Sequence, residues 1–209
     1  MKVGIVSLGC AKNLVDSETI AYLFQSNDVE IVNNVEDADI ILVNTCGFIE
    51  SSKQESIDTI LEMATYNKIL IVTGCLVERY KEELKKELPE VDLFISIKDY
   101  VHFADELNKI IKNKKFTGEL CNNRRIVSTQ PFTAYLKISE GCNNCCTYCA
   151  IPLIRGHFRS FKEEDLIKQA QDLASRGVKE LVVISQDTTR YGEDLKNTDI
   201  CKLLKELLK

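Results

Sequence analysis

The chain has 209 residues, of which 44% are hydrophobic and 28% are charged, so it has apolar material for one or two ordinary domains and does not read as disordered. Its longest apolar runs, such as 40–43 and 69–72, are far shorter than the roughly 20 residues that a membrane span needs. The formal net charge of -5 excludes a basic footprint for nucleic acid over the whole chain and leaves only a local patch open.

Short β-branched segments alternate with longer helical patterns over residues 1–112, which predicts βαβ units around a parallel sheet. The expected strands are 2–7, 29–32, 40–44, 69–73 and 93–96. Apolar residues at three- and four-residue spacing predict surface helices near 13–25, 52–65, 77–88 and 102–112. The sequence therefore predicts an α/β fold that begins with a parallel-sheet domain of the Rossmann or flavodoxin-like kind.

The stretch 113–130 is polar, partly basic and poor in periodic apolar residues, so we expect it to connect two domains. From residue 131 the pattern restarts with a strand at 133–139, a cysteine-rich loop, a helix at 163–176, a strand at 179–185 and a last helix from 198. These elements make two βα units, whereas a closed eight-fold barrel takes about 250 residues. We therefore expect the chain to end inside its second domain, 131–209.

The chain contains nine cysteines. Its N-terminus enters a strand pattern directly, without the apolar core and cleavage site of a secretory signal, so we expect a cytoplasmic protein. In that reducing compartment, clustered cysteines bind metal or take part in chemistry more often than they form disulfides.

Four of these cysteines, Cys142, Cys145, Cys146 and Cys149, stand in one loop. Structural zinc usually takes two ligand pairs that are about 12 or more residues apart, whereas Cys145 and Cys146 are adjacent, so zinc is the weaker alternative. Taken as Cys142-x3-Cys146-x2-Cys149, the loop offers three thiolates to a cuboidal iron–sulfur cluster and leaves one iron open. Cys145 is then a spare thiol, and the alternative is that it competes for the cluster and changes the ligand register. An open iron is typical of a catalytic cluster, because electron-transfer ferredoxins normally close all four corners.

Three more cysteines, Cys10, Cys46 and Cys75, each follow the carboxyl end of an expected parallel strand. Such ends share one edge of the sheet, where parallel α/β proteins place their ligands. Adjacent glycines at 9, 47 and 74 allow the backbone to approach a bulky inorganic group. A joint metal site and three separate buried core cysteines both remain open on position alone.

The cysteine loop is similar to the cluster-binding loop of a known enzyme superfamily. A Cys-x3-Cys-x2-Cys pattern after a strand, with the aromatic Tyr148 before its last cysteine, resembles the radical S-adenosylmethionine (SAM) superfamily. The resemblance implies that the open iron chelates SAM and that the cluster's electron cleaves it to a 5′-deoxyadenosyl radical. It also implies that Tyr148 lies beside the adenine, against the alternative of a half-buried core tyrosine. The second region would then be the first two βα units of an incomplete radical SAM barrel.

Other residues are weaker candidates for the SAM pocket. Arg155 follows the loop, and its forked guanidinium suits a carboxylate, although a solvated surface arginine is an equal alternative. Gln186 and Asp187 end the second barrel strand, and a cap or turn role is the alternative for Asp187. Asn13, Asp16 and Glu18 are candidates for shaping the edge with the dispersed cysteines, although a role in starting their helix is the stronger alternative.

The segments "SLGCAKNLVDSE", "NTCGFIESSKQESID" and "GCLVERYKEELKKELPEVD" resemble the N-terminal domain of methylthiotransferases. That family holds a second cluster on three such cysteines, which implies two 4Fe-4S clusters here, on Cys10, Cys46 and Cys75 and on Cys142, Cys146 and Cys149. The stretches "YLKISEGCNNCCTYCAIPLIRGHFRS" and "ISQDTTRYG" resemble the RimO branch of the family. The resemblance covers essentially the whole chain.

The RimO branch replaces a β-carbon hydrogen of an aspartate in ribosomal protein S-twelve with a methylthio group. The resemblance thus implies that substrate, SAM as methyl donor and radical source, an electron donor such as flavodoxin or ferredoxin, no membrane, and nucleic acid only indirectly. Two alternatives remain: the sister MiaB branch, which modifies adenosine in tRNA, and a non-catalytic iron–sulfur or zinc module. We expect the 209-residue chain alone to bind clusters poorly and to turn over little or not at all, because SAM would be only partly enclosed.

Overall fold

The computed structural model describes residues 1–121 and 123–209. The chain divides into two compact units, Met1–Ile126 and Val127–Lys209. The division lies inside the stretch that the sequence predicts to be a connection.

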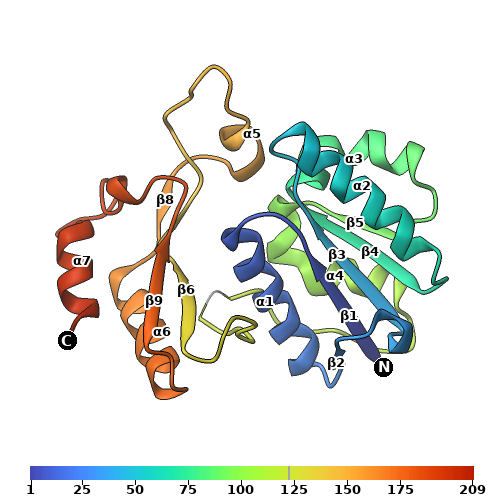
Figure 1. Ribbon diagram of the computed structural model, residues 1–209, viewed down its shortest axis with the longest axis horizontal. Coiled ribbons are helices and arrows are strands. Elements are labelled where there is room, and N and C mark those ends of the chain that lie inside the picture. Colours follow the sequence, from blue (N-terminus) through green and yellow to red (C-terminus); the bar gives the residue numbers. More distant parts are fainter. Residues whose placement is uncertain (122) are drawn as a thin grey trace. The chain divides into compact units, whose positions relative to one another are not determined.

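The first unit is built on a five-stranded parallel sheet (Figure 1). Its strands are β1 (Lys2–Ser7), β2 (Glu30–Val32), β3 (Ile40–Thr45), β4 (Ile69–Gly74) and β5 (Leu93–Ile95), in the order β2-β1-β3-β4-β5. This is the flavodoxin-like order, as expected. Asn44 on the central strand is level with Ser7 on one neighbour and with Thr73 on the other, so β1, β3 and β4 end at nearly the same height.

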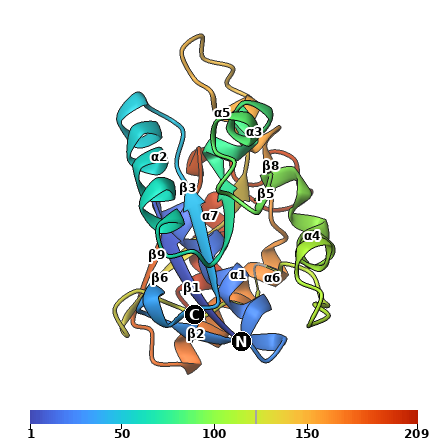
Figure 2. The same cartoon turned by 90° about the vertical axis from the view of Figure 1, so that its right-hand side faces the viewer.

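Helices cover both faces of this sheet. α1 (Ala11–Ser26) and α4 (Phe103–Ile110) cover one face, and α2 (Glu50–Ala64) and α3 (Cys75–Glu87) cover the other; Figure 2 shows α2 and α4 on opposite sides. Short 3-10 helices occupy Val35–Asp37 and Ile97–His102. The strand side chains alternate between the two cores, since Ile40 and Leu42 face α1 while Ile41 and Val43 face α2.

Most of the expected connection packs on the first unit. Phe116 is buried there, and its ring meets the ring of Phe24 edge to face with centroids 5.8 Å apart. Near the end of this segment, Arg125 forms a buried ion pair with Glu18 of α1, with 2.6 Å between Nη1 and Oε2. One aromatic anchor and one ion pair therefore hold a segment that lacks periodic apolar residues.

The second unit holds two parallel strands, β6 (Thr133–Lys137) and β9 (Glu180–Ile184), joined through α6 (Glu163–Ser175). Its other elements are β7 (Ser139–Glu140), α5 (Ile151–Arg155), β8 (Arg159–Ser160), a 3-10 helix at Thr188–Arg190 and α7 (Ile200–Leu207). The expected strand 133–139 is divided at Ile138, whose N–H donates to the carbonyl of Ile184. Beyond that point the chain changes partner, because β7 pairs with β8 and not with β9.

The core of the second unit is small. It contains Leu136, Ile138, Leu166, Tyr191 and Leu203, with a lesser cluster of Ala134, Leu173 and Val178. The amphipathic α7 contributes Leu203 to the main core. Within the described parts of the chain, no helix has the length and apolar character that crossing a bilayer requires.

Candidate metal centres

The three dispersed cysteines stand at one edge of the sheet of the first unit. Cys46 follows β3 directly, Cys75 is the first residue of α3 after β4, and Cys10 is the residue before α1 on the loop that follows β1. Cys46 and Cys75 are each 8% exposed, whereas Cys10 is exposed. Because β1, β3 and β4 are neighbours, the prediction of a shared edge is matched by their order in the sheet.

Glycines bring the loops of this edge together. Gly9 has φ +87°, and a Cβ at that position would lie only 2.9 Å from the Sγ of Cys46. Gly47 presses on the start of α3, where a Cβ would lie 2.8 Å from the Cα of Leu76, the residue after Cys75. A side chain at either position would push the cysteine loops apart, so close approach explains the choice of glycine.

The backbone of Cys46 is held by a residue that the sequence reasoning missed. The hydroxyl of Ser56 on α2 donates to the carbonyl of Cys46 at 2.8 Å and accepts from its N–H at 3.1 Å. Ser56 is fully buried, and both backbone groups of Cys46 are therefore satisfied away from water. A serine ten residues downstream in a helix gives no sequence signal of this contact.

The local electrostatics suit metal-bound sulfur. α1 begins directly after Cys10, whose carbonyl accepts from the N–H of Leu14 at 3.1 Å, and α3 begins at Cys75. A helix N-terminus favours negative charge, and cysteine binds iron as the thiolate. Three thiols on converging loops, two of them at helix starts, thus fit the donor set of an iron–sulfur cluster.

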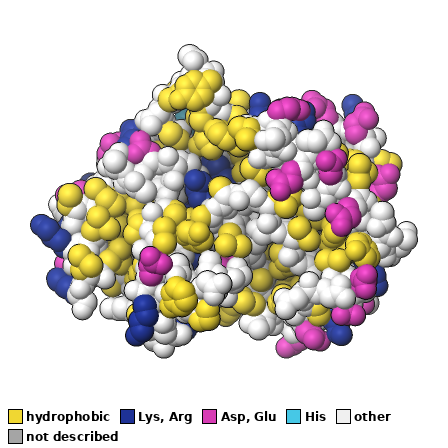
Figure 3. Space-filling view, in the orientation of Figure 1, with side chains coloured by type: hydrophobic (Ala, Val, Ile, Leu, Met, Phe, Trp, Pro, Cys, Tyr) yellow, Lys and Arg dark blue, Asp and Glu magenta, His cyan; other side chains and the backbone are white. Residues whose placement is uncertain are grey.

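The second group of cysteines lies in the loop between β7 and α5, which protrudes at the top of Figure 1 and carries hydrophobic-coloured side chains at its tip in Figure 3. The N–H of Cys142 donates to the carbonyl of Gly156 at 3.1 Å, and the N–H of Cys149 donates to the carbonyl of Cys146 at 2.9 Å. Cys145 has φ +48°, a left-handed conformation that turns the chain just before Cys146. Cys142 and Cys149 are partly exposed, and the other two cysteines are exposed.

Two asparagines inside the loop fix its path. Asn143 Oδ1 accepts from the N–H of Phe158 at 3.0 Å. Asn144 donates to the carboxylate of Asp187 at 3.0 Å and accepts from Arg190 at 2.7 Å. The segment after β9 therefore holds the first half of the loop. Neither asparagine stands out in the sequence pattern.

Asp187 takes the turn role that the sequence left open. Its side chain accepts from the N–H of Thr189 at 3.2 Å and from the hydroxyl of the same residue at 2.6 Å. Hydrogen bonds from Thr189 and Asn144, together with the nearby Arg190, lower the pKa of Asp187 from its ordinary value. The contact with Asn144 also places this carboxylate beside the cysteine loop, so the two expected roles are compatible.

Arg155 and Gln186 converge on Glu140, a residue that no sequence pattern marked. Glu140 accepts from Gln186 Nε2 at 2.6 Å, pairs with Arg155 Nη1 at 3.4 Å and pairs with Lys137 Nζ at 3.1 Å. The amide oxygen of Gln186 is buried, and among the described residues no hydrogen-bond donor meets it. An unmet acceptor of this kind suits a ligand that carries N–H or O–H groups, as SAM does. Tyr148 is 88% exposed, so its ring is open to a ligand.

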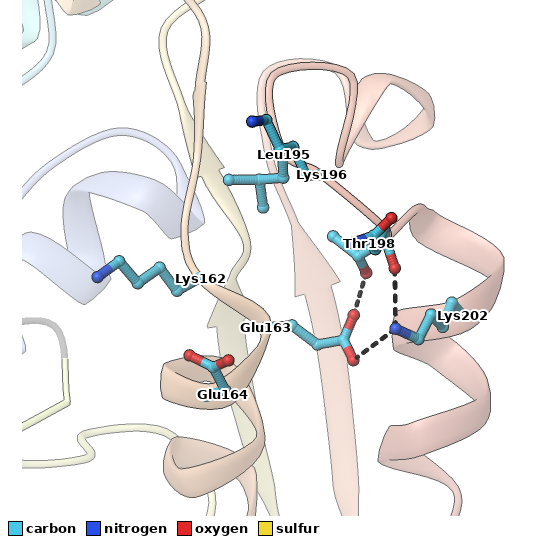
Figure 4. Close-up of a pocket in the computed structure, with 8 residues that line it drawn as sticks. Lys162, Glu163, Glu164, Leu195, Lys196, Thr198 and Lys202 are labelled. Atoms are coloured by element: carbon cyan, nitrogen blue, oxygen red, sulfur yellow. Dashed lines mark hydrogen bonds and ion pairs between the residues drawn. The ribbon is translucent and has the colours of Figure 1, made fainter.

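A separate pocket of about 450 Å³ lies in the second unit between the start of α6 and the start of α7 (Figure 4). Its centre is the carboxylate of Glu163, which accepts from the hydroxyl of Thr198 and stands 3.6 Å from Lys202 Nζ. Lys202 also donates to the carbonyl of Asn197 at 2.8 Å. These contacts tie α6 to α7, and the lining contains no cysteine among the described residues.

In the part of the chain that the structure describes, no three His, Cys, Asp or Glu side chains stand close enough to share one metal ion. A cuboidal cluster sets a different requirement, because each cysteine binds a different iron atom.

Two family models match the chain. Residues 2–96 match the family described as "Uncharacterized protein family UPF0004", and residues 136–209 match the radical SAM superfamily. The cysteines of the first unit's sheet edge lie in the first match and those of the loop lie in the second.

Curated relatives match over essentially the whole chain. The "Ribosomal protein uS12 methylthiotransferase RimO" of Clostridium botulinum (strain Eklund 17B / Type B) is 53% identical over 100% of this chain and 50% of its own length. The protein of the same name from Alkaliphilus oremlandii is 54% identical over 100% of this chain and 49% of its own length. The chain therefore spans about half the length of the curated relatives it matches.

Solved structures share the fold. The radical S-adenosylmethionine methyltransferase TsrM from Kitasatospora setae matches with a TM-score of 0.61 at 11% identity, over 98% of this chain and 50% of that one. The cobalamin-dependent S-adenosylmethionine radical enzyme OxsB matches with a TM-score of 0.56 at 15% identity, over 98% of this chain and 37% of that one. At these identities the matches establish the fold alone.

Proposed function

We propose that the chain belongs to the radical SAM superfamily, whose family model matches residues 136–209, in its methylthiotransferase branch, and that it replaces a β-carbon hydrogen of an aspartate in ribosomal protein uS12 with a methylthio group. The observation that carries the proposal is the combination, in one chain, of the Cys-x3-Cys-x2-Cys loop with a sheet edge that carries Cys10, Cys46 and Cys75. The names of the relatives support the substrate.

The superfamily implies SAM and one iron–sulfur cluster, for which Cys142, Cys146 and Cys149 are the proposed ligands. We propose a second 4Fe-4S cluster on Cys10, Cys46 and Cys75. When bound, the first cluster supplies the electron that cleaves SAM and the second carries the sulfur that is transferred. Acid–base groups do not readily remove hydrogen from an unactivated carbon, so the cofactors carry this step and the protein contributes placement.

The protein's own residues then bind and orient. Glu140 holds Gln186 and Arg155 beside the loop, which leaves the Gln186 amide oxygen available for a donor group of SAM. Asn144 and Asp187 keep the first half of the loop in place. Tyr148 supplies an exposed ring for stacking on an adenine. In each of these proposed roles the residue positions SAM or the loop, and none of them transfers a proton.

We further propose that the reaction takes place in the cytoplasm, where cysteines remain reduced and ribosomal proteins are made. A small electron-transfer protein such as a flavodoxin or a ferredoxin would supply the electron.

Mass spectrometry of uS12 and of tRNA tests the function. Cells that lack the endogenous activity are complemented with the protein, with Cys142→Ala, and with Cys201→Ala as a control at an exposed cysteine outside both trios. A methylthio mass on uS12 with wild type and Cys201→Ala, at low yield because the 209-residue chain is expected to enclose SAM only partly, and lost with Cys142→Ala, is the expected result. The same mass on a tRNA adenosine would favour the sister branch instead.

Metal analysis and an absorption spectrum of the purified protein test the third alternative. One bound zinc without charge-transfer absorption would favour a binding module.

A further inference from the structure

A single side chain contacts all three cysteine-bearing segments of the first unit. The amide nitrogen of Asn13, a fully buried residue of α1, donates to the carbonyl of Leu8 at 3.1 Å and to the carbonyl of Thr45 at 2.9 Å. The amide oxygen accepts from the Sγ of Cys75 at 3.5 Å. Leu8 is two residues before Cys10, and Thr45 is the residue before Cys46.

The amide is itself fixed in place. Asn44 on β3 donates from its side chain to the carbonyl of Asn13 at 2.8 Å and to the hydroxyl of Ser17 at 2.9 Å. The hydroxyl of Ser17 donates in turn to that of Ser7 at the end of β1. On another side, a Cβ at Gly9 would lie 3.4 Å from the Asn13 amide nitrogen, so the loop of Cys10 closes over it. The start of α1 is therefore tied to β1 and β3 through buried polar groups.

We propose that Asn13 is a positioning residue that sets the spacing of Cys10, Cys46 and Cys75 for the second cluster. This inference rests on the proposed function, since it presupposes that cluster. Only an amide offers two donors and an acceptor on one short planar group. An aspartate of the same shape has no donors, and a glutamine is one methylene longer. The two donors of Asn13 join the loop before Cys10 to the end of β3 before Cys46, so its loss releases both of these cysteines at once. The bond from the Cys75 thiol places the third cysteine only before metal binding, because a thiolate bound to iron has no proton to donate.

Asn27, at the other end of α1, provides a matched control. It is also a buried asparagine whose amide nitrogen donates to two carbonyls, those of Leu23 and Thr117, and whose amide oxygen accepts from the N–H of Thr117. These bonds reach the same helix and the same unit but lead to neither Cys10, Cys46 nor Cys75. Asn13→Asp and Asn27→Asp therefore remove the same two amide donors, one at the start of α1 and the other just after its end.

The experiment measures iron and sulfide per chain, with the charge-transfer absorption, after anaerobic reconstitution of the full chain. Asn27→Asp is expected to keep the iron content of wild type, and Asn13→Asp to lose about half of it. Thermal unfolding of the metal-free variants is followed in parallel, because a merely structural role would lower both melting temperatures and leave the iron content of both variants equal. If Asn13→Asp does not fold, the uncharged pair Asn13→Ala and Asn27→Ala takes its place.

Three results would overturn the inference in distinguishable ways. Wild-type iron content in the folded Asn13 variant would refute the role of Asn13 and leave the proposed function standing. Wild-type iron content in Cys46→Ala would refute the second metal site itself, and the role of Asn13 with it. Equal iron loss in the Asn13 and Asn27 variants would reduce Asn13 to a structural residue.

Discussion

The two cysteine trios are held in opposite ways. In the first unit, the cysteines come from three segments far apart in the sequence and share one sheet edge because β1, β3 and β4 are neighbours in a well-buried sheet. In the second unit, the cysteines share one exposed loop whose path depends on side chains such as Asn143 and Asn144. The first site is thus a property of a whole unit, and the second is a property of one short loop.

This difference predicts how each site fails. A change that strains the sheet should lower the stability of the first unit and the affinity of its site together. A change in the loop should abolish its site while the rest of the molecule remains folded. Paired substitutions at glycines, serines and a tyrosine test this contrast.

The largest effect is expected for Gly74→Ala. Gly74 has φ +100°, and a Cβ there would overlap Asn44 Oδ1 and the carbonyl of Thr45. We expect a loss of about 4 kcal/mol or more in the unfolding free energy of the first unit, since both strain and overlap act at the level of the sheet. Urea denaturation followed by circular dichroism measures it.

Gly118→Ala is the control for Gly74→Ala. Gly118 has φ +94°, but no atom of the described residues would lie within 4 Å of a Cβ placed there, so only backbone strain of about 1–2 kcal/mol is expected. Equal effects of the two substitutions would contradict the idea that close approach adds to backbone strain at Gly74.

The corresponding change in the loop is Gly141→Ala. Gly141 has φ +77°, and a Cβ there would overlap the carbonyl oxygen of His157, which lies across the base of the loop. We expect the loop cluster to be lost while the unfolding of the first unit is unchanged, as iron content and urea denaturation would show. Gly156→Ala is the matched control, because φ is +73° but the described residues leave the space open. Retention of both clusters in Gly141→Ala would argue against loop-level control.

A smaller effect is expected for Ser56→Ala. This substitution leaves the buried N–H and carbonyl of Cys46 without their hydroxyl partner, which should cost about 1–3 kcal/mol. Ser26→Ala removes an exposed hydroxyl that donates to the carbonyl of Tyr22 and should cost less than about 0.5 kcal/mol. Chemical denaturation of both variants gives the comparison. A Ser56→Ala protein as stable as Ser26→Ala would show that water replaces the hydroxyl.

The smallest effect concerns Tyr191 in the core of the second unit. Burial, with the nearby carboxylates of Glu163 and Asp194, raises the pKa of Tyr191 to about 12. Because the folded pKa exceeds the ordinary value of about 10, the stabilisation from the neutral phenol is complete below about pH 10 and is lost as the pH rises toward 12. Tyrosinate absorbance should show one late-titrating tyrosine that disappears in Tyr191→Phe. Titration of every tyrosine near pH 10 would contradict this.

The strands of the first unit could be predicted from the sequence because buried parallel strands are continuous apolar runs between helices of 3.6-residue period. The expected edge with Cys10, Cys46 and Cys75 followed from the same pattern. Strand ends were within about two residues, as is usual for boundaries read from a pattern.

Polar contacts across long sequence distances could not be predicted. Asn13 to Thr45, Glu140 to Gln186 and Glu18 to Arg125 each join segments that lie tens of residues apart, and a hydrogen bond leaves no periodic trace in a sequence. The stretch before residue 127 looked like a linker because its apolar anchors, the buried Phe116 and the partly buried Leu120, follow no periodic pattern. The division of the expected strand at Ile138 depends on a partner change that only the fold reveals.

The chain leaves β1 toward one side of the sheet through α1, and it leaves β3 toward the other side through α2. The two connections diverge where these neighbouring strands end, and open α/β sheets accommodate ligands at such points of reversal. The place of a ligand site at this edge is therefore set by topology and would persist with other side chains around it. Replacing the cysteines at this edge would change which ligand binds there, but not where a ligand binds.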